Sequence, residues 1–180
     1  MIRLPAQRAV FVHIPKTGGT SIARALAPYS ERGARTSAYS SHEGGMSGIH
    51  DRPGIDAELP AGWLAFAVVR DPAARLSSMF RHHGNPPEGF ASWCRWLRGY
   101  DSANPFYSPQ VAFLNGVDRR LRFESLLEDW ADLSTRLFGE PMELPHENKA
   151  RAPRQAIDYE LARYWAREIW PEDVAELGYD

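Results

Sequence analysis

The chain has 180 residues, of which 43% are hydrophobic and 24% charged, and its formal net charge is −2. These values are typical of one soluble globular domain, and the slight negative charge argues against a nucleic-acid-binding protein, because such domains are usually basic. No run approaches the roughly 20 apolar residues of a membrane span. The first eight residues also lack the pattern of a secretory signal, so we expect a cytoplasmic protein with no membrane partner.

The single cysteine, Cys94, excludes an intrachain disulfide. It lies in an apolar run, which predicts a small buried side chain rather than a nucleophile. Clusters of Cys and His with zinc-ligand spacing are absent from the sequence, so no metal is predicted.

The first elements predicted along the chain are a strand, a glycine turn and a helix. Residues 9–12 form a short apolar, β-rich run typical of a buried strand, and residues 15–19 form a tight turn with two glycines. Residues 20–27 then have one apolar face at helical spacing. A strand, a glycine loop and a helix in this order are typical of the start of an α/β nucleotide-binding domain.

The rest of the chain continues the α/β pattern after a long polar segment, residues 30–62. A second buried strand is predicted at residues 64–69, followed by a helix that Asp71 caps and Pro72 begins. The remaining predictions are helices at 90–97, 109–114, 126–138, 156–169 and 172–177, and a third strand at 121–123. Together they predict one domain over residues 1–180, a P-loop-like three-layer fold whose small, mostly parallel sheet is flanked by helices.

The loop after the first strand has the composition of an anion site. Gly18 and Gly19 let the backbone approach a ligand, while Thr20 and Ser21 stand at the start of the following helix. Unpaired N–H groups and the helix dipole favour an anion there, and Lys16 adds a full positive charge. The structural alternative is a glycine-rich turn that happens to carry a surface lysine.

The Walker A loop, G-x-x-x-x-G-K-S/T, is the obvious comparison, and the chain does not match it. Lys16 precedes the glycines, and the first glycine of the frame is missing. An ATP-dependent phosphotransferase would also need an acidic strand end for Mg²⁺, for which Asp71 is the candidate. The order of residues therefore argues against an ATPase or a kinase.

A second polar segment follows the strand at residues 64–69. Arg70 ends that strand, and Ser78 follows about two helical turns later. Arginine can bind a phosphate with two parallel hydrogen bonds, and Ser78 reaches the same phosphate if the helix packs beside the strand end. Arg75 is expected at the surface or in an ion pair, and Ser77 as an ordinary helix residue.

Taken together, residues 11–21 and 70–78 resemble the sulfotransferase superfamily, in particular its carbohydrate-type branch. That branch carries a loop His-Ile-Pro-Lys-Thr-Gly/Ala-Gly-Thr-Ser and a second motif Arg-Asn/Asp-Pro-x-x-Arg-x-x-Ser. The resemblance implies the donor 3'-phosphoadenosine 5'-phosphosulfate (PAPS), the product 3',5'-adenosine bisphosphate (PAP) and no metal. It assigns the 5'-phosphosulfate to Lys16, Thr17, Gly18, Gly19, Thr20 and Ser21, and the 3'-phosphate to Arg70 and Ser78.

The sequence departs from the second motif at two positions. The family usually has a large residue where Ala73 stands and an aspartate where Ala74 stands. Neither departure touches Arg70 or Ser78, so both concern packing beside the nucleotide.

For catalysis, Lys16 is the candidate that stabilises charge on the leaving phosphate. A histidine is the expected general base, and the resemblance places one between the two motifs. We favour His42, which stands beside Glu43, with His50 as the second choice. His13 is expected to orient the loop or to pack in the core.

The donor-site residues leave the acceptor open, since a carbohydrate, a lipid, a small alcohol or a peptide tyrosine would each fit them. We expect a hydroxyl or amine on a small molecule or a carbohydrate, and the sequence indicates no oligomeric state. His82 and His83 are expected at the surface or as helix-capping residues. A basic set late in the chain is either a solvated surface or a lid over the nucleotide; it consists of Lys149, Arg151 and Arg154. An aromatic set is either part of the core or a wall of the acceptor pocket. It consists of Trp93, Trp96, Tyr100, Phe106 and Tyr107. A non-catalytic module that binds PAP is the alternative function.

Overall fold

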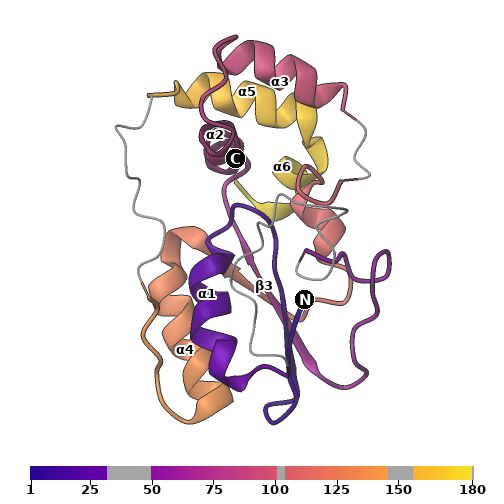
Figure 1. Ribbon diagram of the computed structural model, residues 1–180, viewed down its shortest axis with the longest axis vertical. Helices are drawn as coiled ribbons and strands as arrows, with labels where there is room; N and C mark the ends of the chain where they lie inside the picture. Colours follow the sequence, from indigo (N-terminus) through magenta and orange to yellow (C-terminus); the bar gives the residue numbers. More distant parts are fainter. Residues whose placement is uncertain (32–49, 101–103, 146–155, 180) are drawn as a thin grey trace.

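The protein is described by a computed structural model that covers residues 1–31, 50–100, 104–145 and 156–179 (Figure 1). Within these residues one sheet has four strands in the order β1-β2-β3-β4. β1 pairs antiparallel with β2, and the other two pairings are parallel. The strands are β1 Ile2–Leu4, β2 Ala9–Val12, β3 Leu64–Val69 and β4 Arg119–Arg122.

The two central strands are buried, as expected for parallel strands covered on both faces. All four residues of β2 are buried, and so are five of the six in β3. In the register, Val12 pairs with Ala67, and Val69 pairs with Arg122. The segments that follow β2, β3 and β4 therefore leave the same edge of the sheet, which is where ligands bind in open α/β sheets.

Six α-helices lie in the described residues, with three short 3₁₀ turns. The helices are α1 Gly19–Leu26, α2 Pro72–His82, α3 Phe90–Arg98, α4 Leu126–Phe138, α5 Tyr159–Ile169 and α6 Pro171–Leu177. The 3₁₀ turns are η1 Ala27–Tyr29, η2 Gln110–Phe113 and η3 Phe123–Ser125. None of these helices is long and apolar enough to cross a membrane.

The helices and the sheet share three apolar clusters. α1 and α4 lie next to each other on one side of the sheet, where Ile22 and Trp130 pack against Phe11 and Phe66 (Figure 1). η2 and α6 contribute to a second cluster with Val12 and Val69. This arrangement confirms the predicted α/β fold with a mostly parallel sheet between helical layers.

The third cluster joins α2, α3 and α5, which lie together in the upper part of the molecule (Figure 1). Phe80, Trp93 and Trp165 are among its members, and Cys94 is fully buried within it. Burial raises the pKa of the Cys94 thiol to about 12, so it stays protonated, as the sequence predicted for a packing residue.

Local chemistry explains where the helices begin and end. Asp71 caps α2 by accepting a hydrogen bond from the Ala73 N–H at 2.9 Å, and Pro72 is the first helical residue. α4 ends at Gly139, whose left-handed φ of +87° is favourable for glycine. The predicted helix at 109–114 is instead the 3₁₀ turn η2, and β1 was not predicted.

Candidate functional site

The loop between β2 and α1 turns through two left-handed backbone positions. Lys16 has a φ of +67° and Gly18 a φ of +87°. A lysine in this region is uncommon and is held there by its surroundings. The Thr17 hydroxyl donates to the Ile14 carbonyl at 3.0 Å, so it fixes the turn from inside. The loop thus presents its backbone and the Lys16 side chain at the start of α1.

Both glycines of the loop are required by close neighbours. A Cβ at Gly18 would lie 2.8 Å from Cδ2 of Phe123, and a Cβ at Gly19 would collide with the ring of His13. The backbone therefore passes between these two rings with no room for a side chain. This close approach gives the physical reason for a Gly-Gly pair at these positions.

Arg70 meets the loop from the end of β3. Its Nη1 donates to the Lys16 carbonyl at 3.2 Å, and its guanidinium lies 4.1 Å from the centre of the Phe123 ring. Burial, and then the charge of Arg70, lower the pKa of Lys16. Two cations are thus held close together, an arrangement that favours anionic groups of a ligand beside them. The sequence did not single out Phe123, whose contacts with Gly18 and Arg70 exist only in the folded chain.

Two histidines pack behind the loop. His13 is buried beside Gly19, and His50 is buried with its Nδ1 2.9 Å from the His13 carbonyl oxygen. Their ring centroids are 4.5 Å apart. Burial, and then the charge of His50, lower the pKa of His13 well below its usual range. Burial is also the main cause that lowers the pKa of His50, so both rings are neutral at pH 7.

The family profile of sulfotransferases matches the chain over residues 1–176. The chain belongs to the sulfotransferase family. Searches of curated proteins and of solved structures found no significant match. The family match confirms the resemblance identified from residues 11–21 and 70–78.

The structure of this sulfotransferase brings Lys16, Gly18, Gly19 and Arg70 to one place. Ser78 is half-buried on α2, about two turns beyond the end of β3. Thr20 and Ser21 lie in the first turn of α1. The remaining predicted residues fall outside the described part of the chain. They are His42, Glu43, Lys149, Arg151 and Arg154.

Arg75 is a central structural residue of the site. The sequence placed Arg75 either at the surface or in an ion pair, and the structure has the ion pair. The Nη1 of Arg75 lies 3.6 Å from Oδ2 of Asp173, and both side chains are fully buried. Its Nε donates to the Pro15 carbonyl at 3.0 Å, and its Nη2 donates to the Ser108 carbonyl at 2.9 Å. Burial lowers the pKa of Arg75 to about 10, which leaves it charged at neutral pH.

Asp173 extends this network from α6 to η2. Its carboxylate accepts hydrogen bonds from the N–H groups of Gln110 and Val111, each at 2.9 Å. Burial raises the pKa of Asp173, while Arg75 and the two N–H donors oppose that rise. Through Arg75 the network also holds Pro15, the first residue of the loop. Sequence spacing could not reveal it, because Arg75 and Asp173 lie far apart along the chain.

The positive charge of Lys16 affects the pKa of two histidines at the C-terminal end of α2. His83 is the C-cap of α2, as the sequence allowed. Partial burial, and then the charge of Lys16, lower the pKa of both His82 and His83, that of His82 to about 4. The charge of Lys16 is therefore felt by the two histidines as well as by Arg70.

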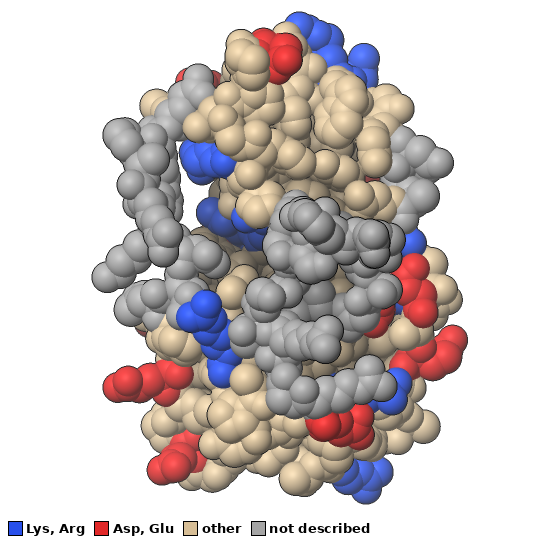
Figure 2. Space-filling view, viewed as in Figure 1, with Lys and Arg blue, Asp and Glu red and all other residues tan. Residues whose placement is uncertain are grey.

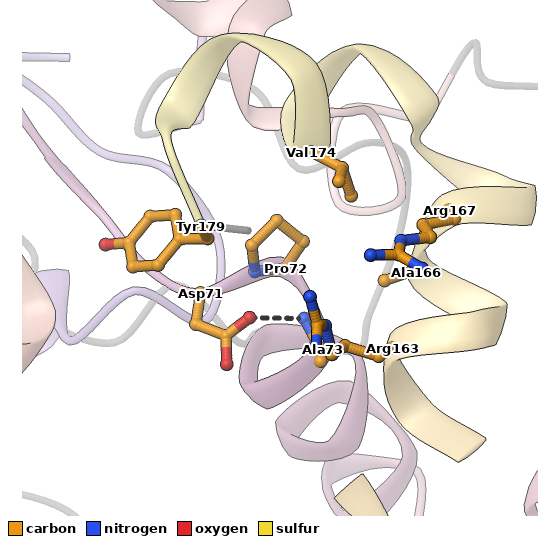
Figure 3. A pocket seen from close by; sticks show the side chains of 8 residues that line it. All are labelled: Asp71, Pro72, Ala73, Arg163, Ala166, Arg167, Val174 and Tyr179. Carbon is orange, nitrogen blue, oxygen red and sulfur yellow. Dashed lines mark hydrogen bonds between the residues drawn. The ribbon is translucent and has the colours of Figure 1, made fainter. Parts of the chain in front are cut away.

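A small pocket lies next to Asp71, between the start of α2 and the helices α5 and α6 (Figure 3). Ala73 and Ala166 line it, with Arg163, Arg167 and Tyr179 among their neighbours. Ala73 stands where the resemblance predicts a large residue, and its side chain lines this pocket. Figure 2 shows Lys and Arg side chains gathered along one side of the hollow between the upper and lower halves of the molecule.

Among the described residues, no group of three or more His, Cys, Asp or Glu side chains could hold a metal ion.

Proposed function

We propose that the protein transfers a sulfuryl group from PAPS to an acceptor hydroxyl or amine and releases PAP. One observation carries the proposal: a lysine-bearing loop, closed to any side chain at Gly18 and Gly19, meets Arg70 from the next strand. Family membership supports sulfuryl transfer in general. The donor, the residues and their roles are our assignment.

The residues present fit a donor with two anionic ends. The start of α1 offers N–H groups that have no partner within the helix, and Lys16 lies at the same point. Arg70, stacked on Phe123, supplies a separate planar cation for the 3'-phosphate, and Ser78 is the second contact that we assign to it. PAPS supplies an activated sulfuryl group whose leaving phosphate gains charge during transfer, and Lys16 stabilises that charge.

His50 is the general base that the described residues support. If its Nδ1 donates to the His13 carbonyl, the lone pair of Nε2 is left to accept a proton. Because its pKa is lowered, His50 is neutral and ready to accept that proton at pH 7. His42, which the sequence favours, remains the competing assignment. The variants His42→Ala and His50→Ala decide between the two histidines. Each variant is first shown to bind PAP with the affinity of the wild type, and the variant that then loses turnover identifies the base.

Calorimetric titration of the full chain with PAP, beside ATP and Mg²⁺, tests the nucleotide site. We expect selective PAP binding that Arg70→Ala weakens at least tenfold, because a charged hydrogen bond to a phosphate contributes about 1.5–3 kcal/mol. Arg119→Ala is the matched control, since Arg119 lies on the neighbouring strand in an exposed pair with Asp132. A preference for ATP with Mg²⁺ would overturn the proposal.

Turnover with labelled PAPS then separates an enzyme from a module that only binds PAP. The assay offers phenols, alcohols, amines and sugars as acceptors. Transfer to any of these classes that Lys16→Met abolishes, with PAP still bound, supports an enzyme. PAP binding with no transfer to any class would favour the non-catalytic module instead.

A further inference from the structure

The peptide group between Arg70 and Asp71 is held at both of its polar ends by side chains. Its carbonyl accepts a hydrogen bond from Nε2 of Gln110 at 2.8 Å, and its N–H donates to Oε1 of Glu124 at 3.0 Å. Gln110 belongs to η2 and Glu124 to η3, so the two contacts come from different elements. Because Pro72 follows, helical backbone is disfavoured at Asp71, whose ψ is 121°. The backbone that carries Arg70 therefore has little freedom to rotate.

η3 contacts both the side chain and the backbone of Arg70. Phe123 lies beneath the guanidinium, and the next residue, Glu124, binds the peptide group that follows Arg70. Phe123 also lies against Gly18 of the loop. Glu124 therefore fixes the backbone of Arg70 relative to the ring on which its guanidinium rests.

The second carboxylate oxygen of Glu124 is bound by the segment after α6. The Tyr179 hydroxyl donates to Oε2 at 2.7 Å, a length typical of a hydroxyl bound to a carboxylate. Burial, and then this hydrogen bond, raise the pKa of Tyr179, so its hydroxyl stays protonated at neutral pH. The Arg122 guanidinium lies 4.6 Å from the centre of the Tyr179 ring and donates to the Leu177 carbonyl at 3.1 Å. These contacts fasten the segment to the end of β4.

The cap of α2 uses other atoms. Oδ1 of Asp71 accepts from the Ala73 N–H, and its Oδ2 accepts from the Tyr159 hydroxyl at 2.9 Å. Glu124 instead binds the Asp71 N–H, on the side of the strand. The start of α2 is thus supported by the Asp71 side chain, whereas Glu124 supports the peptide group that orients Arg70.

The inference rests on the proposed function, which assigns the 3'-phosphate to Arg70. We propose that Glu124 and Tyr179 are positioning residues for Arg70, and that they set how strongly the site prefers a nucleotide with a 3'-phosphate. We call these two residues the clasp. The clasp acts through the peptide group after Arg70. Arginine binds a phosphate through two parallel hydrogen bonds, and a small shift of its backbone misaligns both.

The charge of Glu124 and its positioning role predict opposite effects on PAP binding. A carboxylate close to a phosphate site repels the ligand, so removal of the charge alone should tighten binding. Loss of the hydrogen bond to Asp71 should weaken it. Glu124→Gln loses the charge but keeps an oxygen that can accept from that N–H, whereas Glu124→Ala loses both. The comparison of these two variants therefore isolates the positioning role.

Calorimetric titration of the full chain with PAP and with 5'-AMP tests the inference, because 5'-AMP lacks the 3'-phosphate. The wild type should prefer PAP at least about tenfold. Glu124→Ala should bind PAP about fivefold more weakly than Glu124→Gln and bind 5'-AMP within about twofold of the wild type. Glu124→Gln should bind PAP at least as tightly as the wild type.

Tyr179→Phe tests the second member of the clasp and removes only one hydroxyl. It should weaken PAP binding about threefold and leave 5'-AMP binding unchanged. In the Glu124→Ala background it should have no further effect, because Tyr179 acts through Glu124. This conservative variant keeps the inference testable if Glu124→Ala does not fold.

Glu128→Ala and Tyr164→Phe are the matched controls, an exposed acidic residue in the first turn of α4 and an exposed tyrosine on α5. Neither should change the ratio of the PAP and 5'-AMP affinities, and urea unfolding gives the stability of every variant. A clasp that only stabilises the fold would lower the free energy of unfolding and leave this ratio unchanged. That result, or equal PAP affinity of Glu124→Ala and Glu124→Gln, would overturn the inference alone. A wild type with no preference for PAP over 5'-AMP would overturn the proposed function as well.

Discussion

Gln110 binds both backbone polar groups of Arg70. Its Oε1 accepts from the Arg70 N–H at 2.9 Å, and its Nε2 donates to the Arg70 carbonyl at 2.8 Å. The side chain thus pairs with the backbone just beyond the end of β3, in the way a neighbouring strand would. Since Asp173 holds the Gln110 N–H in turn, α6 supports the arginine that we assign to the 3'-phosphate.

Gln110→Ala should weaken PAP binding about tenfold without removing any group that touches PAP. The change leaves two backbone groups of Arg70 without their partners and costs about 1–3 kcal/mol of stability. Calorimetry gives the affinity, and urea unfolding gives the free energy of unfolding. Gln110→Glu keeps the acceptor and loses the donor, so an intermediate PAP affinity is expected. Equal PAP affinity in all three proteins would contradict a positioning role.

The sequence predicted the parts of the site that are local and missed those that depend on distant contacts. Residues 9–21 were predicted as a strand, a glycine loop and a helix because each has its own pattern and caps. Gln110 carried no signal, because its role depends on Arg70, which is 40 positions away in the chain. β1 was missed because three residues are too few for a period, and its pairing with β2 is a tertiary fact.

Gly18→Ala and Gly139→Ala form a matched pair that isolates the close approach in the loop. Both glycines have a φ of +87°, but a Cβ at Gly139 meets nothing within 4 Å, whereas one at Gly18 meets Phe123. Each substitution carries the backbone cost of about 1–2 kcal/mol. Gly18→Ala should in addition displace Phe123 and weaken PAP binding severalfold, which calorimetry measures. If both variants bind PAP like the wild type, Phe123 does not support the nucleotide site.

His13 should make the fold less stable as the pH falls below 6.5. Its pKa is lowered in the fold by burial and by the nearby charges of His50, the N-terminus and Lys16. The unfolded chain therefore binds more protons between the ordinary pKa of 6.5 and the lower folded pKa. One such histidine costs about 1 kcal/mol of stability between pH 6.5 and 5.5.

Urea unfolding at pH 7.5, 6.5 and 5.5 measures this dependence. His13→Gln cannot titrate and should show a flatter pH profile, even if its stability at pH 7.5 is lower. His82→Gln should flatten the profile as well, because the pKa of His82 is lowered to about 4, and the double variant with His13→Gln should be flatter than either single variant. A profile for His13→Gln as steep as that of the wild type would assign the loss to other groups.

The buried pair of Arg75 and Asp173 should be far more sensitive to substitution than an exposed pair. Asp173→Asn leaves the Arg75 guanidinium buried without its counterion, which costs about 3–5 kcal/mol. Asp132→Asn, which removes the exposed partner of Arg119, should cost about 0–1 kcal/mol. Urea unfolding measures both.

The double variant Arg75→Met with Asp173→Asn then separates a structural role from a role at the loop. Removing the buried charge along with its partner should recover part of the stability that Asp173→Asn loses. PAP binding should not recover, because the Pro15 carbonyl still lacks the Arg75 donor that fixes the start of the loop. Recovery of both stability and PAP affinity would mean that Arg75 serves the fold alone. Recovery of stability without affinity would make Arg75 a positioning residue for the loop that carries Lys16.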